Sequence, residues 1–322
     1  MSALPPMPHL IVALATSPTQ GCQQAMKNLA LPQLDRLLAR LSPAGLDAGN
    51  ETDFSPPHER ALARHLGLAA GPAGTTPWAA WHRLQTPAHV PTDHGLAWAF
   101  ITPCQWQADA NHVLLADPAQ LQLTEDDSRS LLAILAPWFA EDGITLVYDQ
   151  PTRWLAHGAA FDGLATASLD RVLQRDVSSW LPDKLQARNL HRLHSEMQML
   201  LYTHPFNDAR AARRLPPVNA FWVHGAGALP QPPVARHAPQ LPNGLLQAAL
   251  HEDWGAWSRA WAELDAGPVA QLAAHVGRGG SARLTLCGER SAMTWHTAPR
   301  GLGQRIQSLF RPRRFADVRE QL

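Results

Sequence analysis

The sequence predicts an α/β fold, because short apolar runs alternate along the chain with segments whose apolar residues recur at helical spacing. Residues 10–14 and 144–148 have the composition of buried strands. Residues 31–41 and 185–202 place leucine and methionine three and four positions apart, as an amphipathic helix does. We therefore expect a sheet that is flanked by helices.

Further elements follow from the same patterns. Residues 124–139 are expected to form a helix, since Thr124 can cap it and three acidic residues follow in its first turn. Trp254, Trp257 and Trp261 share one face of another helix, which favours packing in the core over a platform for a ligand. The remaining predictions are helices at 58–66 and 269–275 and strands at 96–102, 218–223 and 282–287.

Composition excludes several classes of protein. The chain has 322 residues, of which 45% are hydrophobic and 17% charged, so it can bury a large core. Its 27 basic and 27 acidic residues give no net charge, which argues against a protein that coats nucleic acid. No cationic leader and no run of about 20 apolar residues is present, so we expect a cytoplasmic protein without a membrane span.

Common catalytic signatures are absent from the sequence. There is no phosphate-binding loop of the Walker type, no G-x-S-x-G, no S-x-x-K and no H-E-x-x-H. Three distant cysteines form no metal-binding pair. His191 and His194 share a helix face and are candidates for a metal site, but hydrogen-bonded helix histidines are the alternative that we favour.

The polar residues that most suggest a binding site are concentrated between His204 and Gly227. A turn after the long helix is expected to carry Asn207 and Arg210, and the strand that follows carries Asn219 and His224. Arginine grips phosphate or carboxylate through paired hydrogen bonds, asparagine donates and accepts, and glycine permits close approach. These properties predict a site for a small anionic ligand, formed by Asn207, Arg210, Asn219, His224, Gly225 and Gly227. Alternatively, the two asparagines tie loops together through backbone hydrogen bonds.

The end of the chain is rich in arginine. Between residues 300 and 319, Leu302, Ile306, Leu309 and Phe310 follow helical spacing among six arginines, up to a break at Pro312. We expect a surface helix that covers the core. Contact of this tail with nucleic acid or anionic lipid is the alternative.

The segment MQMLLYTHPFNDARAARRLPPVNAFWVHGAG, from Met197 to Gly227, closely resembles the RpfE-type regulatory proteins of beta- and gamma-proteobacteria, which are often labelled cofactor-independent phosphoglycerate mutase. LPQLDRLLARL at 31–41, FSPPHERALAR at 54–64 and ITPCQWQ at 101–107 fit the same family. The resemblance extends over nearly the whole chain. More distantly, HP-x-N-x-x-R followed by PP-x-N and G-x-G resembles a block of archaeal-type cofactor-independent phosphoglycerate mutases.

This resemblance implies a fold of the alkaline phosphatase superfamily. Members have an α/β core, two divalent metal ions, a phosphorylated serine and an inserted lobe. Carried over to this chain, it implies a core made of residues 1–92 and 205–322, with a smaller α/β lobe inserted at 93–204 and a basic helix at the end.

The chain departs from the enzymes at their metal ligands. Where they carry aspartate and glycine after the first strand, this chain has Ala13 to Thr16, and where they carry aspartate and histidine near the last strand it has Cys287 to Arg290. Two-metal phosphoryl transfer needs such ligands. We therefore expect a pseudoenzyme without a cofactor, a regulatory protein that binds a small anionic ligand or a protein partner. The alternatives are an active mutase or phosphatase with Mn or Zn in a rearranged site, and a scaffold for a partner.

Overall fold

The computed structural model describes residues 7–109, 111–229, 237–298 and 313–322. Contacts between residues divide the chain into two compact units, one made of segments 1–66 and 235–322 and the other of segment 67–234. The boundaries that the family resemblance implies lie after residues 92 and 204 instead. The difference arises because residues 97–104 and 220–228 form neighbouring strands of one sheet, although they lie on opposite sides of the boundary expected after residue 204.

The first unit contains a four-stranded sheet in the order β1-β9-β10-β2. β1 and β9 are parallel, whereas β10 runs antiparallel to both β9 and β2. Each residue of β1 is buried, as expected for a strand covered on both faces. The strands are β1 (His9–Val12), β9 (Arg283–Cys287), β10 (Ala292–His296) and β2 (Ser42–Asp47).

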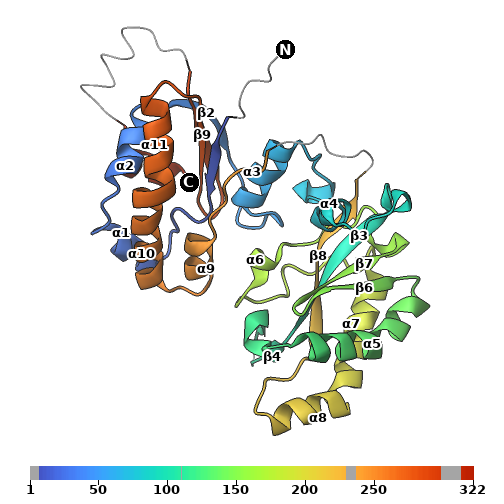
Figure 1. Ribbon diagram of the computed structural model, residues 1–322. Coiled ribbons are helices and arrows are strands. Elements are labelled where there is room, and N and C mark those ends of the chain that lie inside the picture. The colour runs from blue at the N-terminus through green and yellow to red at the C-terminus, as the bar shows by residue number, and fades with distance from the viewer. Residues whose placement is uncertain (1–6, 110, 230–236, 299–312) are drawn as a thin grey trace. The chain divides into compact units, whose positions relative to one another are not determined.

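Helices cover both faces of this sheet. Leu10 and Val12 point into a large apolar cluster with Trp257 and Trp261, and Figure 1 shows α2, α10 and α11 on that side. The intervening Ile11 packs instead against Ala61 of α3. The helices of the unit are α1 (Gln20–Met26), α2 (Pro32–Leu38), α3 (Pro57–Leu66), α9 (Gly244–Leu250), α10 (Trp254–Leu264), α11 (Ala270–Gly277) and α13 (Phe315–Val318).

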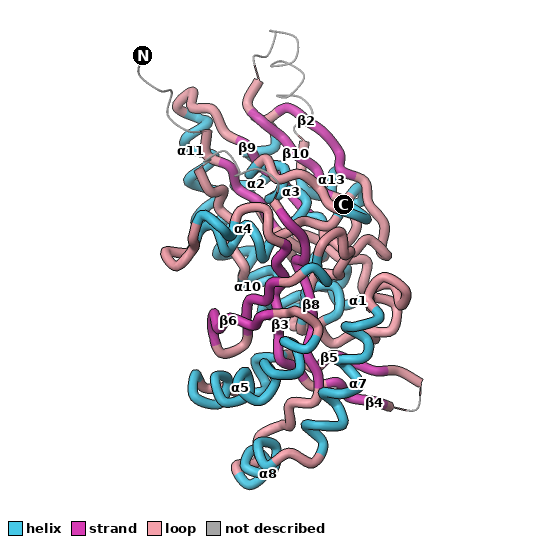
Figure 2. Tube along the Cα trace, turned by 90° about the vertical axis from the view of Figure 1, so that its right-hand side faces the viewer, coloured by secondary structure: helices cyan, strands magenta, loops and turns pink. Residues whose placement is uncertain are grey.

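The second unit contains a sheet in the order β6-β7-β3-β8, antiparallel throughout. The edge strand β8 and its neighbour β3 lie side by side in Figure 2. The strands are β6 (Thr145–Gln150), β7 (Arg153–His157), β3 (Ala97–Cys104) and β8 (Ala220–Ala228), with a separate hairpin of β4 (Trp106–Ala108) and β5 (Val113–Leu115).

One face of this sheet packs against long helices and the other against short ones. Ala99, Ile101 and Val223 join the apolar face that is covered by α5 and α7. α4 contacts β3 and β8 on the opposite face, where Trp78 lies against Gly225. The helices are α4 (Trp78–Gln85), α5 (Glu125–Glu141), α6 (Leu169–Val172), α7 (Arg188–Tyr202) and α8 (Pro205–Ala212). The α/β class predicted from the sequence is confirmed.

One sequence-based expectation is corrected by the structure, and another falls outside the residues that it describes. The turn expected at Asn207 and Arg210 is wrong, because both residues lie in α8, which Pro205 begins and the side chain of His204 caps. The four apolar residues that define the basic tail helix lie outside the described residues. Among the helices that are described, none is long and apolar enough to cross a membrane.

Candidate functional site

Asn207 uses its whole side-chain amide to join backbone segments. Its Nδ2 donates to the carbonyl oxygens of Leu201 and Val218, both at 2.8 Å, and its Oδ1 accepts from the amide of Val218 at 3.0 Å. The amide therefore ties the end of α7 to the approach to β8. These are the contacts of the structural alternative raised from the sequence.

Arg210 is also turned inward. Its side chain is 1% exposed, and it donates from Nε to the carbonyl of Pro216 at 2.9 Å and from Nη2 to the carbonyl of Leu121. The nearest carboxylate is that of Asp127, 3.9 Å from Nη1. Burial lowers the pKa of Arg210, and the charge of Asp127 opposes this effect. The guanidinium holds three chain segments together through Nε and Nη2, whereas its buried Nη1 makes no hydrogen bond to the described residues.

The other predicted residues are positioned by the sheet. Asn219 bonds to both backbone groups of Trp106, accepting from its amide at 2.7 Å and donating to its carbonyl at 2.9 Å. Gly225 and Gly227 have positive φ angles of 60° and 135°. A Cβ on either would lie 3.1 Å from the Cβ of Trp78 or Pro77, so both glycines let α4 approach β8 closely.

His224 lies in a cluster that the sequence analysis missed. The ring of Phe100 is its centre, with the ring centroids of His224 and His82 at 5.2 and 5.5 Å and the guanidinium of Arg153 at 4.7 Å. His224 Nε2 is 3.0 Å from Oγ1 of Thr102. Burial, followed by the charge of Arg153, lowers the pKa of His224 to about 4, so its imidazole is neutral at neutral pH.

Asp149 connects His82 and Arg153 in this cluster. It accepts from His82 Nε2 at 3.1 Å and from Arg153, whose Nε and Nη2 lie 2.8 and 2.7 Å from one carboxylate oxygen. Burial alone would raise the pKa of Asp149, but the hydrogen bonds from His82 and Arg153 outweigh it and the pKa is lowered. The side chains of His82 and Arg153 keep 26% and 29% of their surface exposed, so this cluster is accessible to a ligand.

A sequence signal for this cluster does exist. Asp149 and Arg153 flank the turn between two strands, which contains Pro151, and the pairing of opposite charges across a tight turn is a recognisable pattern. His82 lies far from this turn in the sequence, on α4, and Phe100 is one apolar residue among many in β3. Strand pairing brings Phe100 close to Asp149 and Arg153, and the packing of α4 on the sheet adds His82.

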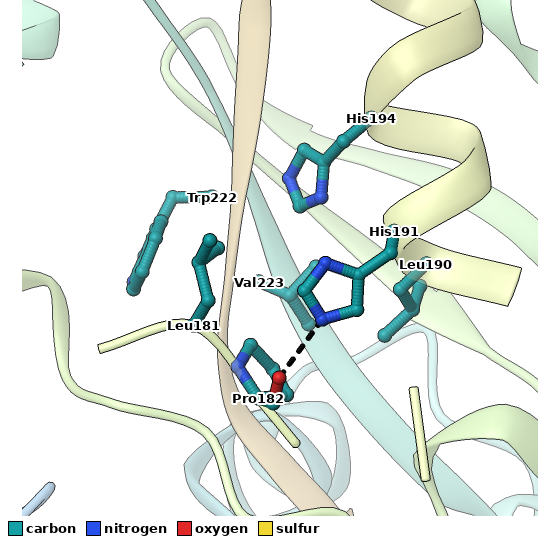
Figure 3. A pocket seen from close by; sticks show the side chains of 7 residues that line it. All are labelled: Leu181, Pro182, Leu190, His191, His194, Trp222 and Val223. Carbon is teal, nitrogen blue, oxygen red and sulfur yellow. Dashed lines mark hydrogen bonds between the residues drawn. The ribbon is translucent and has the colours of Figure 1, made fainter. Parts of the chain in front are cut away.

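The histidine pair of α7 lies beside a small pocket (Figure 3). His191 Nε2 donates to the carbonyl of Pro182 at 2.9 Å, and His194 Nε2 donates to that of Phe221 at 2.7 Å. Burial lowers the pKa of His194 to about 4. Both histidines thus donate hydrogen bonds to backbone carbonyls, as we expected in preference to a metal site. The pocket is lined by Leu181, Pro182, Leu190, His191, His194, Trp222 and Val223.

In the first unit, the loop that follows β1 is held by the core. The amide of Ala15 donates to the carbonyl of Cys287 at 2.7 Å, which places this loop beside the end of β9. Two indole groups of α10 hold its carbonyls: Trp257 Nε1 donates to Leu14 at 2.9 Å and Trp261 Nε1 to Ala15 at 3.2 Å. The tryptophan stripe is therefore core, as predicted, and also fixes this loop.

Few metal-binding groups lie at this edge of the sheet. The hydroxyl of Thr16 donates to the sulfur of Met26, and Ser17 Oγ is 3.4 Å from the carboxylate of Glu289. Burial raises the pKa of the Cys22 thiol, which keeps it protonated. One carboxylate, hydroxyls and a neutral thiol do not fit a two-metal phosphoryl-transfer centre.

No protein-family model and no curated protein matches this chain. Among solved structures, it is similar to a cofactor-independent phosphoglycerate mutase from Thermoplasma acidophilum, with 12% identity, coverage of 90% of both chains and a TM-score of 0.35. It is also similar to the PH0037 protein from Pyrococcus horikoshii, with 12% identity, coverage of 92% of this chain and 88% of that chain, and a TM-score of 0.40. At these values, neither similarity assigns the chain to a family.

Proposed function

We propose that this chain is a non-catalytic regulatory or binding protein on a phosphoglycerate-mutase-like fold, and that it binds a small phosphorylated or carboxylate ligand. The observation that carries the first part is the edge formed by the ends of β1 and β9. In α/β proteins, ligands and catalytic groups gather at the carboxyl ends of parallel strands. Here that edge presents Leu14 and Ala15, whose carbonyls accept from buried tryptophans.

The second part of the proposal concerns the cluster around Phe100. Arg153 is the partly exposed cation there, and its guanidinium can donate to a phosphate or carboxylate. His224 supplies a neutral imidazole in the same cluster, and it is the one residue predicted from the sequence that we retain for ligand binding. Asn207, Arg210 and Asn219 instead support the backbone around it.

Removal of metal is expected to leave the protein unchanged. A metal ion that binds only the folded state raises its stability by mass action, so chelation of a resident ion would lower the melting temperature. We expect the melting temperature to be the same with and without EDTA, and purified protein to show no phosphoglycerate mutase turnover with Mn or Zn. Stoichiometric Mn or Zn, together with turnover that EDTA abolishes, would instead establish the active mutase or phosphatase.

Ligand binding is expected to depend on Arg153. A ligand at one hundred times its Kd stabilises the folded state by about 2.7 kcal/mol. We expect 3-phosphoglycerate to raise the melting temperature of the wild type and not that of Arg153→Gln. Arg129→Gln is the matched control, because Arg129 also lies over an aromatic ring, that of Tyr148, and pairs with a carboxylate, that of Glu125, on the surface.

The two parts of the proposal fail separately. A thermal shift that survives in Arg153→Gln would place the ligand elsewhere. The absence of a shift in the wild type with both 3-phosphoglycerate and inorganic phosphate would exclude phosphorylated ligands. Neither result bears on the EDTA and turnover experiment, which tests whether the protein is a metal-dependent enzyme.

A further inference from the structure

A continuous chain of side-chain hydrogen bonds passes through the first unit. His65 Nε2 lies 2.8 Å from the carbonyl oxygen of His237, and His65 Nδ1 lies 2.9 Å from Nδ1 of His9. On the other side of its ring, His9 Nε2 lies 2.9 Å from Oγ1 of Thr285, which is itself 2.9 Å from Oγ1 of Thr294. The chain joins α3 to β1, β9 and β10, and the proposed function uses none of its members.

The partners fix the direction of every hydrogen bond when both rings are neutral. A carbonyl only accepts, so His65 Nε2 carries a hydrogen and His65 Nδ1 is an acceptor. His9 Nδ1 must then donate to His65, which leaves His9 Nε2 as an acceptor. Thr285 donates to that nitrogen, and Thr294 donates to the hydroxyl oxygen of Thr285. All donors therefore point towards His237.

One added proton reverses this chain without breaking it. When His65 carries hydrogens on both ring nitrogens, its Nδ1 donates to His9, and His9 must accept there. The hydrogen of His9 then lies on Nε2 and points to Thr285, whose hydroxyl turns to donate to Thr294. A second proton would place two N–H groups against each other across the 2.9 Å between the rings.

The surroundings also oppose a second charge. His9 is 7% exposed, and the neighbouring cation on β9 is Arg283, its partner in the register of the sheet. Burial, the charge of His65 and the charge of Arg283 lower the pKa of His9 to about 3. Two further histidines belong to these surroundings. His296 of β10 lies opposite Arg283 in the register of the sheet, and the carbonyl of His237 accepts from His65.

We propose that His9 and His65 form a one-proton switch, in which a proton taken up at α3 reverses the hydroxyl hydrogen bonds between β9 and β10. This goes beyond the proposed function, since it makes the interior of the first unit sensitive to pH at a place remote in sequence from the ligand cluster. Coupled sites of this kind titrate as a pair. The pair, rather than either ring, has the apparent pKa.

Long-range ¹⁵N correlation spectra of the histidine rings in the full chain test the switch directly. At pH 8 we expect the Nδ1–H form of His9 and the Nε2–H form of His65, with signals assigned from the variants His9→Gln and His65→Gln. At pH 5 we expect one proton on the pair, with His9 neutral and its hydrogen moved to Nε2. Independent uptake of two protons near the ordinary histidine pKa, or an Nε2–H form of His9 at pH 8, would overturn the proposal.

Discussion

Arg210→Ala is expected to destabilise the second unit by about 2–6 kcal/mol, because each of two buried carbonyls left without a donor costs roughly 1–3 kcal/mol. The carbonyls belong to Pro216 and Leu121, and the guanidinium that serves them is almost completely buried. The midpoint of urea unfolding, followed by circular dichroism, measures this loss.

Arg213→Ala is the control for this experiment. Arg213 pairs with the same carboxylate of Asp127, but half of its side-chain surface is exposed. An exposed ion pair contributes about 0–1 kcal/mol, so this variant should unfold close to the wild-type midpoint. Equal midpoints for the two variants would contradict the structural role of Arg210 and return it to the ligand site predicted from the sequence.

Trp261→Ala is expected to cost about 3–5 kcal/mol in the first unit, the range for removing a buried large aromatic side chain. The more informative variant is Trp261→Phe, which keeps most of the buried surface and removes the donor to the carbonyl of Ala15. A buried carbonyl left without its donor makes an additional loss of about 1–3 kcal/mol. Calorimetry or urea unfolding measures both.

Trp254→Phe is the reference for the aromatic exchange alone. Trp254 is partly buried on the same helix and packs at the margin of the same apolar cluster. We expect a smaller loss for Trp254→Phe than for Trp261→Phe. The reverse order would mean that the indole of Trp261 contributes packing alone and that the loop after β1 is held by other contacts.

The long elements were predictable from sequence because their apolar spacing is a local property. Residues 124–139 and 185–202 become α5 and α7, with Leu131, Leu135, Leu193 and Met197 buried as their spacing predicts. The strand expected at 282–287 becomes β9. β2 could not be found in this way, because four of its six residues are exposed and it is held by pairing with β10.

The polar site could not be assigned because sequence does not show which partner a polar side chain meets. Asn207 and Arg210 have the chemistry of ligand-binding residues, but the amide of Asn207 and the Nε and Nη2 of Arg210 donate to carbonyls of their own chain. His82 and Asp149, which do lie in a partly exposed cluster, are 67 residues apart, so no local pattern links one to the other. Their proximity depends on the antiparallel pairing of the second sheet and on the packing of α4 against it.

The parallel pairing of β1 with β9 has a consequence for the order of folding. Residues 9–12 pair with residues 283–286, so β1 cannot join its sheet until synthesis has passed β9. The strands of the second sheet all lie within 67–234, and that segment can fold while synthesis continues. Until then Leu10, Ile11 and Val12 form an apolar segment without its partner strand, and we expect this segment to be exposed to aggregation while synthesis continues.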